Sequence, residues 1–351
     1  MGKLAVYKYF SFMLLVITLL LAIFTLFGLF GGNANPAKST ALAMLVYILP
    51  FLIIGNGVMA LIWLIRRRWH WMAIPVLTIL CCIPYIGTIY QLGWFGSNQT
   101  SRNGIKIATY NVALFGRETT GFKAQDILAE MKKQSVDVLC LQEYLDDSGE
   151  MRNSDSYKDY FPYMATGRSD MVIYSRYPID NHEVILFGNT NNSAMWADID
   201  VLGKPIRVFN AHLETTGYNR TLHKAAKMQL QGQNVENNAL LRSIYGTYMR
   251  GMVARAHQAD TLAAAISESD IPVIVCGDFN DVPYSYVYNT VLGNLVDGFK
   301  ECGKGFMYTM SGKKRVRIDY IFHDENLKGD NYYRQDLTYS DHYPVYMKIS
   351  F

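Results

Sequence analysis

Two short polar motifs, each beside an apolar run, carry the residue types that hydrolytic chemistry needs. Asp278 and Asn280 follow the apolar run 271–276, and Asp341 and His342 precede the run 343–349. Residues two apart in an extended chain share one face, so we expect Asp278 and Asn280 to point the same way. A carboxylate, an amide and an imidazole can hold a metal ion, activate water and donate to a phosphate. The pattern predicts metal-assisted hydrolysis of a phosphate ester.

Other polar side chains lie within or directly after apolar runs that are typical of buried strands. They are Asn111, Glu143, His212 and Asp319. Taken alone, each is as consistent with a turn, a cap or a hydrogen-bonded core histidine. Their recurrence favours a single site, because strand ends can converge on one rim of a sheet.

The elements that must position these side chains alternate between strands and helices. Strands are expected at 105–110, 138–142, 171–174, 183–187, 194–201, 206–213, 271–276, 317–322 and 343–349, with an amphipathic helix at 123–134 and a long helical stretch before residue 271. Many strands with few crossover helices predict two mixed sheets packed face to face. The expected fold class is α/β, a four-layer α/β/β/α sandwich.

The charge of the chain is divided unevenly. Residues 1–100 hold six Lys and Arg and no Asp or Glu, which leaves 27 basic and 30 acidic residues in 101–351. The formal net charge of +3 therefore comes from the N-terminal part, and it does not indicate a basic nucleic-acid-binding surface. The five cysteines show no zinc-binding spacing and no disulfide framework.

The N-terminal part has the composition of a membrane region. The segments 9–30 and 42–65 contain no charge and exceed the roughly 20 residues that cross a bilayer as a helix. A third candidate, 72–92, is interrupted by Pro75 and Pro84. We therefore expect about three transmembrane helices in 1–96, a linker at 97–104 and a catalytic domain at 105–351. The alternative for residues 1–37 is a cleaved signal peptide.

Basic residues indicate the orientation in the cytoplasmic membrane. Lys3 and Lys8 precede the first span, and three arginines at 66–68 separate the second from the third. The positive-inside rule places both groups in the cytoplasm. Three crossings would put residues 101–351 on the extracytoplasmic side, whereas failure of the third would leave them in the cytoplasm.

The ordered set of motifs resembles the endonuclease/exonuclease/phosphatase superfamily, which has the deoxyribonuclease I-like fold. The resemblance runs from about Lys106 to the C-terminus. The matching segments are 141–143, 175–179, 210–213, 277–281, 317–321 and 340–342. The N-terminal membrane region has no counterpart in this resemblance.

The resemblance implies a Mg²⁺-dependent site, with Mn²⁺ as a substitute. Glu143, assisted by Asn111, would bind the metal, and Asp341 would lie near it. Asp278 would orient or deprotonate the attacking water, and Asn280 would donate to the phosphate. The remaining roles fall to His342, which would stabilise transition-state charge, to Asp319, which would orient His342, and to His212, a second phosphate-facing imidazole.

Three basic residues and one long insertion are further candidates for binding the substrate. Arg176, Lys313 and Lys314 are candidate substrate-binding residues, although the two lysines fit a solvated hairpin turn equally well. Residues 214–262 are longer than a simple connection and include a basic, aromatic run. A long surface helix with solvated arginines is the plain interpretation of the insertion. A lid or membrane-facing arm that presents substrate is the sharper hypothesis.

The expected activity is that of a membrane-anchored phosphohydrolase, first a phosphodiesterase or nuclease. A phospholipid or sphingolipid head-group phosphodiesterase or phosphatase is the alternative, favoured by the anchor. A non-catalytic membrane binding module is a third possibility, against which the intact set of site residues argues. A transporter is disfavoured because the apolar segments contain no acidic residue. The expected partners are a phosphodiester substrate and the lipid bilayer, and the sequence indicates no obligate protein partner.

Overall fold

The computed structural model describes residues 3–93, 104–116, 122–144, 154–168, 170–188, 190–231, 236–312 and 315–351. The chain forms two compact units. One consists of Met1–Thr88 together with Pro283–Asn289, and the other of Ile89–Val282 together with Thr290–Phe351. The predicted linker at 97–104 lies almost wholly outside the described residues.

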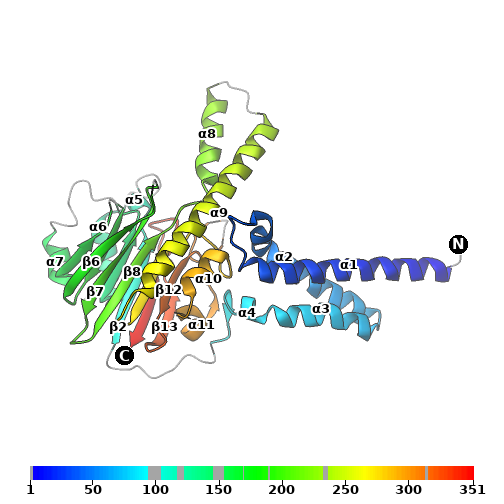
Figure 1. Cartoon of the computed structure of the whole chain (residues 1–351), viewed down its shortest axis with the longest axis horizontal. Helices are drawn as coiled ribbons and strands as arrows, with labels where there is room; N and C mark the ends of the chain where they lie inside the picture. The colour runs from blue at the N-terminus through cyan, green and yellow to red at the C-terminus, as the bar shows by residue number, and fades with distance from the viewer. Residues whose placement is uncertain are drawn as a thin grey trace. The chain divides into compact units, whose positions relative to one another are not determined.

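Two six-stranded sheets form the centre of the larger unit (Figure 1). Sheet I has the order β13–β14–β2–β3–β5–β4 and sheet II the order β10–β12–β9–β8–β7–β6. The strands of sheet I are β2 (Gly104–Asn111), β3 (Val138–Gln142), β4 (Tyr163–Thr166), β5 (Met171–Ser175), β13 (Lys328–Arg334) and β14 (Val345–Ser350). Those of sheet II are β6 (Ile179–Leu186), β7 (Ser193–Asp200), β8 (Pro205–His212), β9 (Val273–Asp278), β10 (Val296–Asp297) and β12 (Asp319–His323).

Both sheets are mixed, as the sequence predicts. β2 pairs in parallel with β3, and β8 pairs in parallel with β9, whereas the other pairings are antiparallel. A separate two-stranded ribbon joins β1 (Tyr90–Gln91) to β11 (Gly305–Phe306). The two parallel pairs matter for function, because the carboxyl ends of parallel neighbours meet at one edge.

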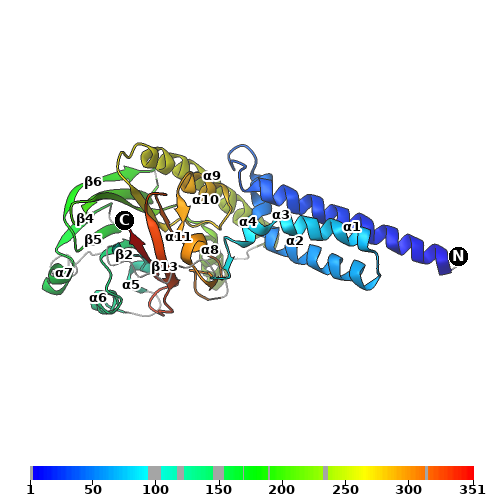
Figure 2. The same cartoon turned by 90° about the horizontal axis from the view of Figure 1, so that it is seen from below.

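Strand alternation divides the apolar residues between two cores. Ile105 and Ile107 of β2 belong to a core that also contains Val208 and Ile274 of sheet II, so it lies between the sheets. Residues of the opposite parity, such as Tyr110, pack with α6 (Ala124–Lys133) and α7 (Asp155–Tyr160). Figure 2 shows α6 and α7 outside one sheet and α9 (Asn237–Ser267) outside the other. The four-layer α/β/β/α arrangement is confirmed.

A helical arm interrupts this regular architecture between β8 and β9. It consists of α8 (Tyr218–Leu230) and the first part of α9, up to Arg250. Figure 1 shows the arm projecting away from the sheets, whereas the rest of α9 lies along sheet II. The remaining short helices are α5 (Ala113–Gly116), α10 (Tyr286–Leu292) and α11 (Gly298–Cys302).

The smaller unit is built on α1 (Lys3–Gly31), α2 (Thr40–Ile65), α3 (Trp69–Cys81) and α4 (Ile83–Ile86). Two buried polar contacts join α1 to α2. The Asn56 amide donates to Thr25 Oγ1 over 2.8 Å, and the Trp63 indole donates to Thr18 Oγ1 over 2.9 Å. Such interhelical hydrogen bonds fix how two otherwise apolar helices pack.

The segment Pro283–Asn289 packs within this helical unit. Asn289 Nδ2 donates to the Gly32 carbonyl over 2.9 Å, and Asn35 Nδ2 donates to the Tyr286 hydroxyl over 3.1 Å. The ring of Tyr284 meets Tyr85 edge-on, with 5.7 Å between ring centroids. The helical unit is therefore completed by residues that follow the polar motif at 277–281.

Among the described residues, two helices are long and apolar enough to cross a membrane, Ala5–Gly31 and Thr40–Ile65. The predicted third crossing at 72–92 is not formed by one helix. α3 contains 13 residues and ends at Cys81, and α4 begins at Ile83 with Pro84 in its first turn. The extracytoplasmic orientation depended on that crossing, and the structure does not support it.

Candidate active site

The register of sheet II brings three ionisable side chains together. His212, the last residue of β8, is the parallel partner of Asp278, the last residue of β9. Asp319, the first residue of β12, is the antiparallel partner of the same Asp278. Asp278 therefore stands between an imidazole and a second carboxylate because of strand pairing alone.

Sheet I contributes the facing residues in the same way. Asn111, at the end of β2, pairs with Gln142, at the end of β3, so that Glu143 follows directly at the same edge. Asn111 Nδ2 donates to Glu143 Oε1 over 3.1 Å and to Asp278 Oδ2 over 3.0 Å. This single amide links the carboxylates of the two sheets.

Unusual backbone conformations turn the chain at these positions. Gly277 has φ +137°, and a Cβ there would lie 2.0 Å from the Ala211 carbonyl oxygen, so only glycine fits beside β8. Glu143 and Asn280 adopt the left-handed conformation, with φ +49° and +52°. Such conformations are costly for residues with a side chain and cluster at functional sites.

His342 and Asp319 form a buried pair. The His342 ring places Nδ1 3.0 Å from Asp319 Oδ2, while Nε2 lies 3.8 Å from Asp278 Oδ2. Burial alone would lower the pKa of His342, but the carboxylates of Asp319 and Asp278 raise this pKa well above its ordinary value. The two carboxylates therefore favour the protonated form of the buried ring.

Burial has the opposite consequence for the central carboxyl group. Asp278 is 1% exposed, and its burial, together with the neighbouring Asp319, raises its pKa. Both histidines act against this shift. A carboxylate with a raised pKa accepts a proton more readily, which is the property required of a general base.

His212 is the second imidazole at this edge. Its Nδ1 lies 3.0 Å from Asp170 Oδ2, and its Nε2 lies 3.7 Å from Glu143 Oε1. Burial opposes protonation, but Asp170, Asp278 and Glu143 together raise the pKa of His212. The buried Nε2 atom has no hydrogen-bond partner among the described residues. A buried polar atom of this kind points to a group that binds there.

The hydrogen bonds of Asn280 differ from the predicted contact with phosphate. Its Nδ2 donates to the Leu213 carbonyl over 3.0 Å and to Asp278 Oδ2 over 3.2 Å. Its backbone N–H donates to Asp278 Oδ1 over 2.8 Å. Asn280 thus holds the Asp278 carboxylate, and donation to a phosphate requires that one of these bonds be exchanged.

The remaining predicted residues divide into three cases. Asp341 is exposed and lies close enough to His342 to raise the pKa of that ring. Arg176 pairs with Asp137 over 2.8 Å, and Asp137 precedes β3, whereas Glu143 follows it. Arg176 therefore lies at the opposite end of the strand and does not join the site. Lys313 and Lys314 lie outside the described residues.

Two residues that support the site are not among the predicted site residues. Asp170 orients His212 from the turn that precedes β5. Arg255 of α9 is fully buried, with Nε 3.2 Å from Asp281 Oδ2 and Nη1 3.0 Å from the Glu214 carbonyl oxygen. Arg255 thereby connects the loop after His212 to the motif that contains Asp278.

The donor atoms suit a hard divalent cation. Asp278, Asp319 and His342 place ligand atoms within 4.8 Å of one another, but a protonated His342 ring has no lone pair for a metal. The Glu143 carboxylate, which accepts from the same Asn111 amide as Asp278, is a further oxygen ligand at this edge. Carboxylate oxygens are the preferred ligands of Mg²⁺, which takes few ligands from protein. Together with the unpartnered His212 Nε2, this set fits a site that holds a metal ion and a phosphate.

Comparison with known proteins identifies the family to which this chain belongs. The sequence model of the endonuclease/exonuclease/phosphatase family matches residues 108–342, and the chain belongs to that family of phosphoester hydrolases. A domain of unknown function matches residues 11–89. None of the curated proteins matches the sequence.

Solved structures agree with the fold. D. rerio TDP2 humanised by 14 mutations aligns with a TM-score of 0.51 and 18% identity, over 71% of this chain and 99% of its own. D. rerio TDP2 complexed with a single-strand DNA product gives the same values. A Bacteroides vulgatus protein of the same family has a TM-score of 0.51 and 16% identity, over 71% of this chain and 100% of its own.

Proposed function

We propose that this protein is a membrane-anchored, divalent-metal-dependent phosphodiesterase that cleaves a P–O bond by attack of water. The observation that carries the proposal is the convergence of Glu143, Asp278 and Asp319 with two imidazoles at one edge of the two sheets. The buried Nε2 atom of His212 supports the proposal, because it has no hydrogen-bond partner among the described residues and can bond to a ligand oxygen. α1 and α2 would supply the anchor.

The proposed roles follow from the contacts. Asp278, whose pKa is raised by burial, would take the proton of the attacking water. His342, held by Asp319, would neutralise the charge that develops on the phosphate oxygens. His212 would face the same phosphate through Nε2, and Asn280 would keep the Asp278 carboxylate in place.

Metal binding would fall mainly to Glu143. Its carboxylate is only half-buried, and Asn111 holds Oε1 at 3.1 Å. Asp341, exposed at the same edge, is a second candidate ligand. A bound Mg²⁺ would neutralise negative charge on the non-bridging oxygens and orient the substrate. Asn111 would act by fixing the ligand, since its own Oδ1 accepts the Ala113 N–H over 3.0 Å.

A nucleic acid is the first substrate to test. D. rerio TDP2, which has the same fold, was solved with a single-strand DNA product. A lipid head group is the second candidate, and a specific observation favours it. Leu230, Leu241 and Tyr245 of the helical arm are 90%, 63% and 59% exposed. Large exposed apolar side chains next to basic ones are typical of segments that contact a membrane surface.

The test uses the full-length chain in detergent micelles, because the helical unit includes Pro283–Asn289. Supercoiled plasmid and vesicles of phosphatidylcholine with sphingomyelin are offered separately with Mg²⁺. We expect cleavage of one substrate, loss of cleavage in EDTA, and loss in His342→Ala. His182→Ala, a matched change at an exposed histidine of β6, should retain it. Cleavage that survives both EDTA and His342→Ala would contradict the proposed site.

A further inference from the structure

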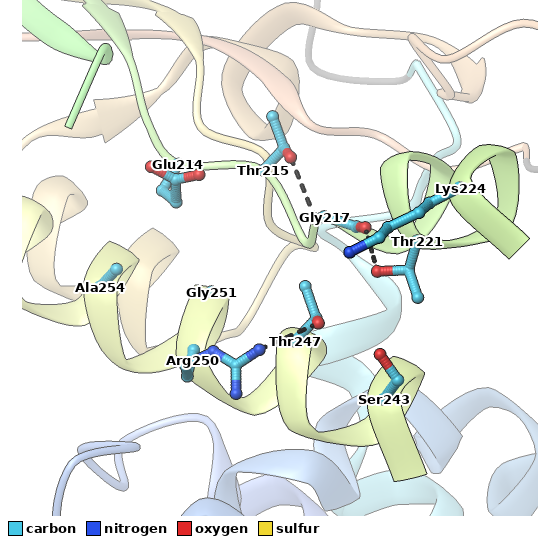
Figure 3. A pocket seen from close by; sticks show the side chains of 10 residues that line it. All are labelled: Glu214, Thr215, Gly217, Thr221, Lys224, Ser243, Thr247, Arg250, Gly251 and Ala254. Atoms are coloured by element: carbon cyan, nitrogen blue, oxygen red, sulfur yellow. Dashed lines mark hydrogen bonds between the residues drawn. The ribbon is translucent and has the colours of Figure 1, made fainter. Parts of the chain in front are cut away.

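A cavity of about 430 Å³ lies at the base of the helical arm. Its volume is in the range of small-molecule binding sites. Figure 3 shows the ten residues that line it, which are Glu214, Thr215, Gly217, Thr221, Lys224, Ser243, Thr247, Arg250, Gly251 and Ala254. They come from α8, from α9 and from the loop that follows His212. The cavity is therefore framed by the insertion at 214–262.

The lining has the chemistry of an anion site. Lys224 enters from α8 and Arg250 from α9, on two sides of the cavity (Figure 3). The hydroxyl groups of Thr215, Thr221, Ser243 and Thr247 also line it. Arg250 Nη2 donates to Thr247 Oγ1 over 3.1 Å, which holds the guanidinium beside a hydroxyl. Thr221 Oγ1 already donates to the Gly217 carbonyl over 3.1 Å, which leaves the two cations and three hydroxyl groups as donors to a phosphate. The single carboxylate of the lining, that of Glu214, would repel the phosphate.

The charge of the insertion supports the same ligand. Residues 215–255 contain six Lys and Arg and one acidic residue, Glu236, whereas 101–351 as a whole carries a formal charge of −3. The positive charge of the catalytic domain is therefore concentrated on this segment. A concentration of positive charge raises the local concentration of anionic ligands.

The cavity adjoins the proposed catalytic groups through one short loop. Glu214 is two residues beyond His212, so their Cα atoms are within about 7 Å. On the catalytic side, the Leu213 N–H donates to the Asp278 carbonyl over 3.0 Å. On the cavity side, the Glu214 N–H donates to Gln258 Oε1 over 2.7 Å. The loop that joins the catalytic side to the cavity is thus fixed on both sides.

We propose that this cavity binds a second phosphate group of the substrate, one that does not react. The inference rests on the proposed function, because it assigns the substrate a phosphate beyond the scissile one. The substrate phosphate would lie between Lys224 and Arg250, which line the cavity from α8 and α9. The substrate class is accordingly a molecule with two or more phosphates.

The binding test does not depend on turnover. Inorganic pyrophosphate is titrated calorimetrically into the full-length chain in detergent micelles containing EDTA. We expect saturable binding that the double change Lys224→Ala with Arg250→Ala weakens at least tenfold. Lys227→Ala with Arg242→Ala removes the same charge from exposed positions of α8 and α9 that do not line the cavity, and should alter the affinity less than twofold.

Separate results would overturn the cavity assignment. They are an equal loss of affinity in both double variants, no loss in the Lys224 and Arg250 variant, or no saturable binding by the unmodified chain. His342→Ala distinguishes the cavity from the catalytic edge, where the proposed function places the reacting phosphate. Binding in the cavity predicts less than a twofold change in affinity. A tenfold loss in His342→Ala would instead place the bound pyrophosphate at that edge.

A second measurement identifies the source of the phosphate. With Mg²⁺ and the substrate that the chain cleaves, the Lys224 and Arg250 variant should raise KM at least tenfold, with a smaller change in kcat. An unchanged KM together with weakened pyrophosphate binding would show a free phosphate effector and overturn the substrate assignment. Absence of all turnover would overturn the proposed function and that assignment together, while the titration still decides whether the cavity binds phosphate.

Discussion

The proposed catalytic edge and the helical arm hold their charges in contrasting ways. At the edge, Asp278, Asp319 and His342 are at most 5% exposed, and each is paired with another ionisable group. In the arm, Lys224 and Arg250 are exposed around a cavity. Buried, paired charges have fixed positions and shifted pKa values, whereas exposed cations attract a ligand without a large desolvation cost. The comparison separates residues suited to chemistry from residues suited to recognition.

The largest effect should come from the centre of the buried edge. Asp278→Asn keeps the shape of the side chain but removes the proposed base, so we expect turnover to fall by roughly 10²- to 10⁴-fold. Asp180→Asn, the same change at an exposed position of β6, should leave turnover unaltered. Initial rates with the cleaved substrate measure both. A loss below tenfold in Asp278→Asn would assign the proton transfer to another group.

The next effect concerns Arg255, where the arm meets the edge. Arg255→Met leaves Asp281 buried without its ion-pair partner, so the free energy of unfolding should fall by about 3–5 kcal/mol. Turnover should fall too, because the Glu214 carbonyl loses a donor two residues from His212. Thermal unfolding in detergent measures the first effect, and initial rates the second.

Two control variants sharpen the Arg255 experiment. Arg242→Met, on an exposed face of the same helix, should change neither stability nor turnover. Arg255→Met combined with Asp281→Leu should be more stable than Arg255→Met alone, because both charges of the buried ion pair are then removed. If the double variant were the less stable one, the ion pair would not be the cause.

A smaller, more specific effect is expected from Asp319→Asn. The Asp319 carboxylate helps to raise the pKa of His342, so its removal should lower that pKa. The imidazolium form would then be lost at a lower pH, and the alkaline limit of activity should move to lower pH. Rate profiles from pH 5 to pH 10 would measure the shift. An unmoved alkaline limit would mean that His342 does not act as an imidazolium.

The smallest effect should come from Arg176→Ala. This side chain is 46% exposed and pairs with Asp137 at the strand end away from Glu143. We expect activity within twofold of the unmodified chain and a loss of stability below about 1 kcal/mol. A tenfold rise in KM would instead show that Arg176 binds the substrate, as the sequence predicts. Recognition would then not be confined to the arm.

The sequence was informative where apolar runs end in polar residues. β9 is fully buried, so its apolar residues form a continuous run that predicts a strand. The polar residue at the end of that run, Asp278, could therefore be recognised as a candidate site residue. β4 and β13 were not predicted, because both expose several polar or aromatic residues at the edges of sheet I. These two unpredicted edge strands do not contribute to the site, because the site residues lie on or beside the interior strands.

Tertiary pairing accounts for what sequence reasoning missed. Asp170 precedes β5 in a turn, and only the fold places it 3.0 Å from His212. Arg255 lies in the insertion 214–262, for which the sequence predicts a surface helix with solvated arginines. It is instead fully buried, because Asp281 and the Glu214 carbonyl compensate its charge. Arg176 belongs to a matching motif, yet the strand direction carries it to the far end of β3.

The packing of Pro283–Asn289 with the first helices has a consequence for synthesis. The hydrogen bond between Gly32 and Asn289 joins residues 257 positions apart. At about 5–20 residues per second, roughly 13–50 s separate the appearance of its two ends on the ribosome. The hydrogen bond at the turn between α1 and α2 therefore forms only after most of the larger unit has been synthesised. Synthesis of the helical unit therefore ends only after most of the larger unit has been made. A chain divided near residue 100 would separate Pro283–Asn289 from the rest of the helical unit.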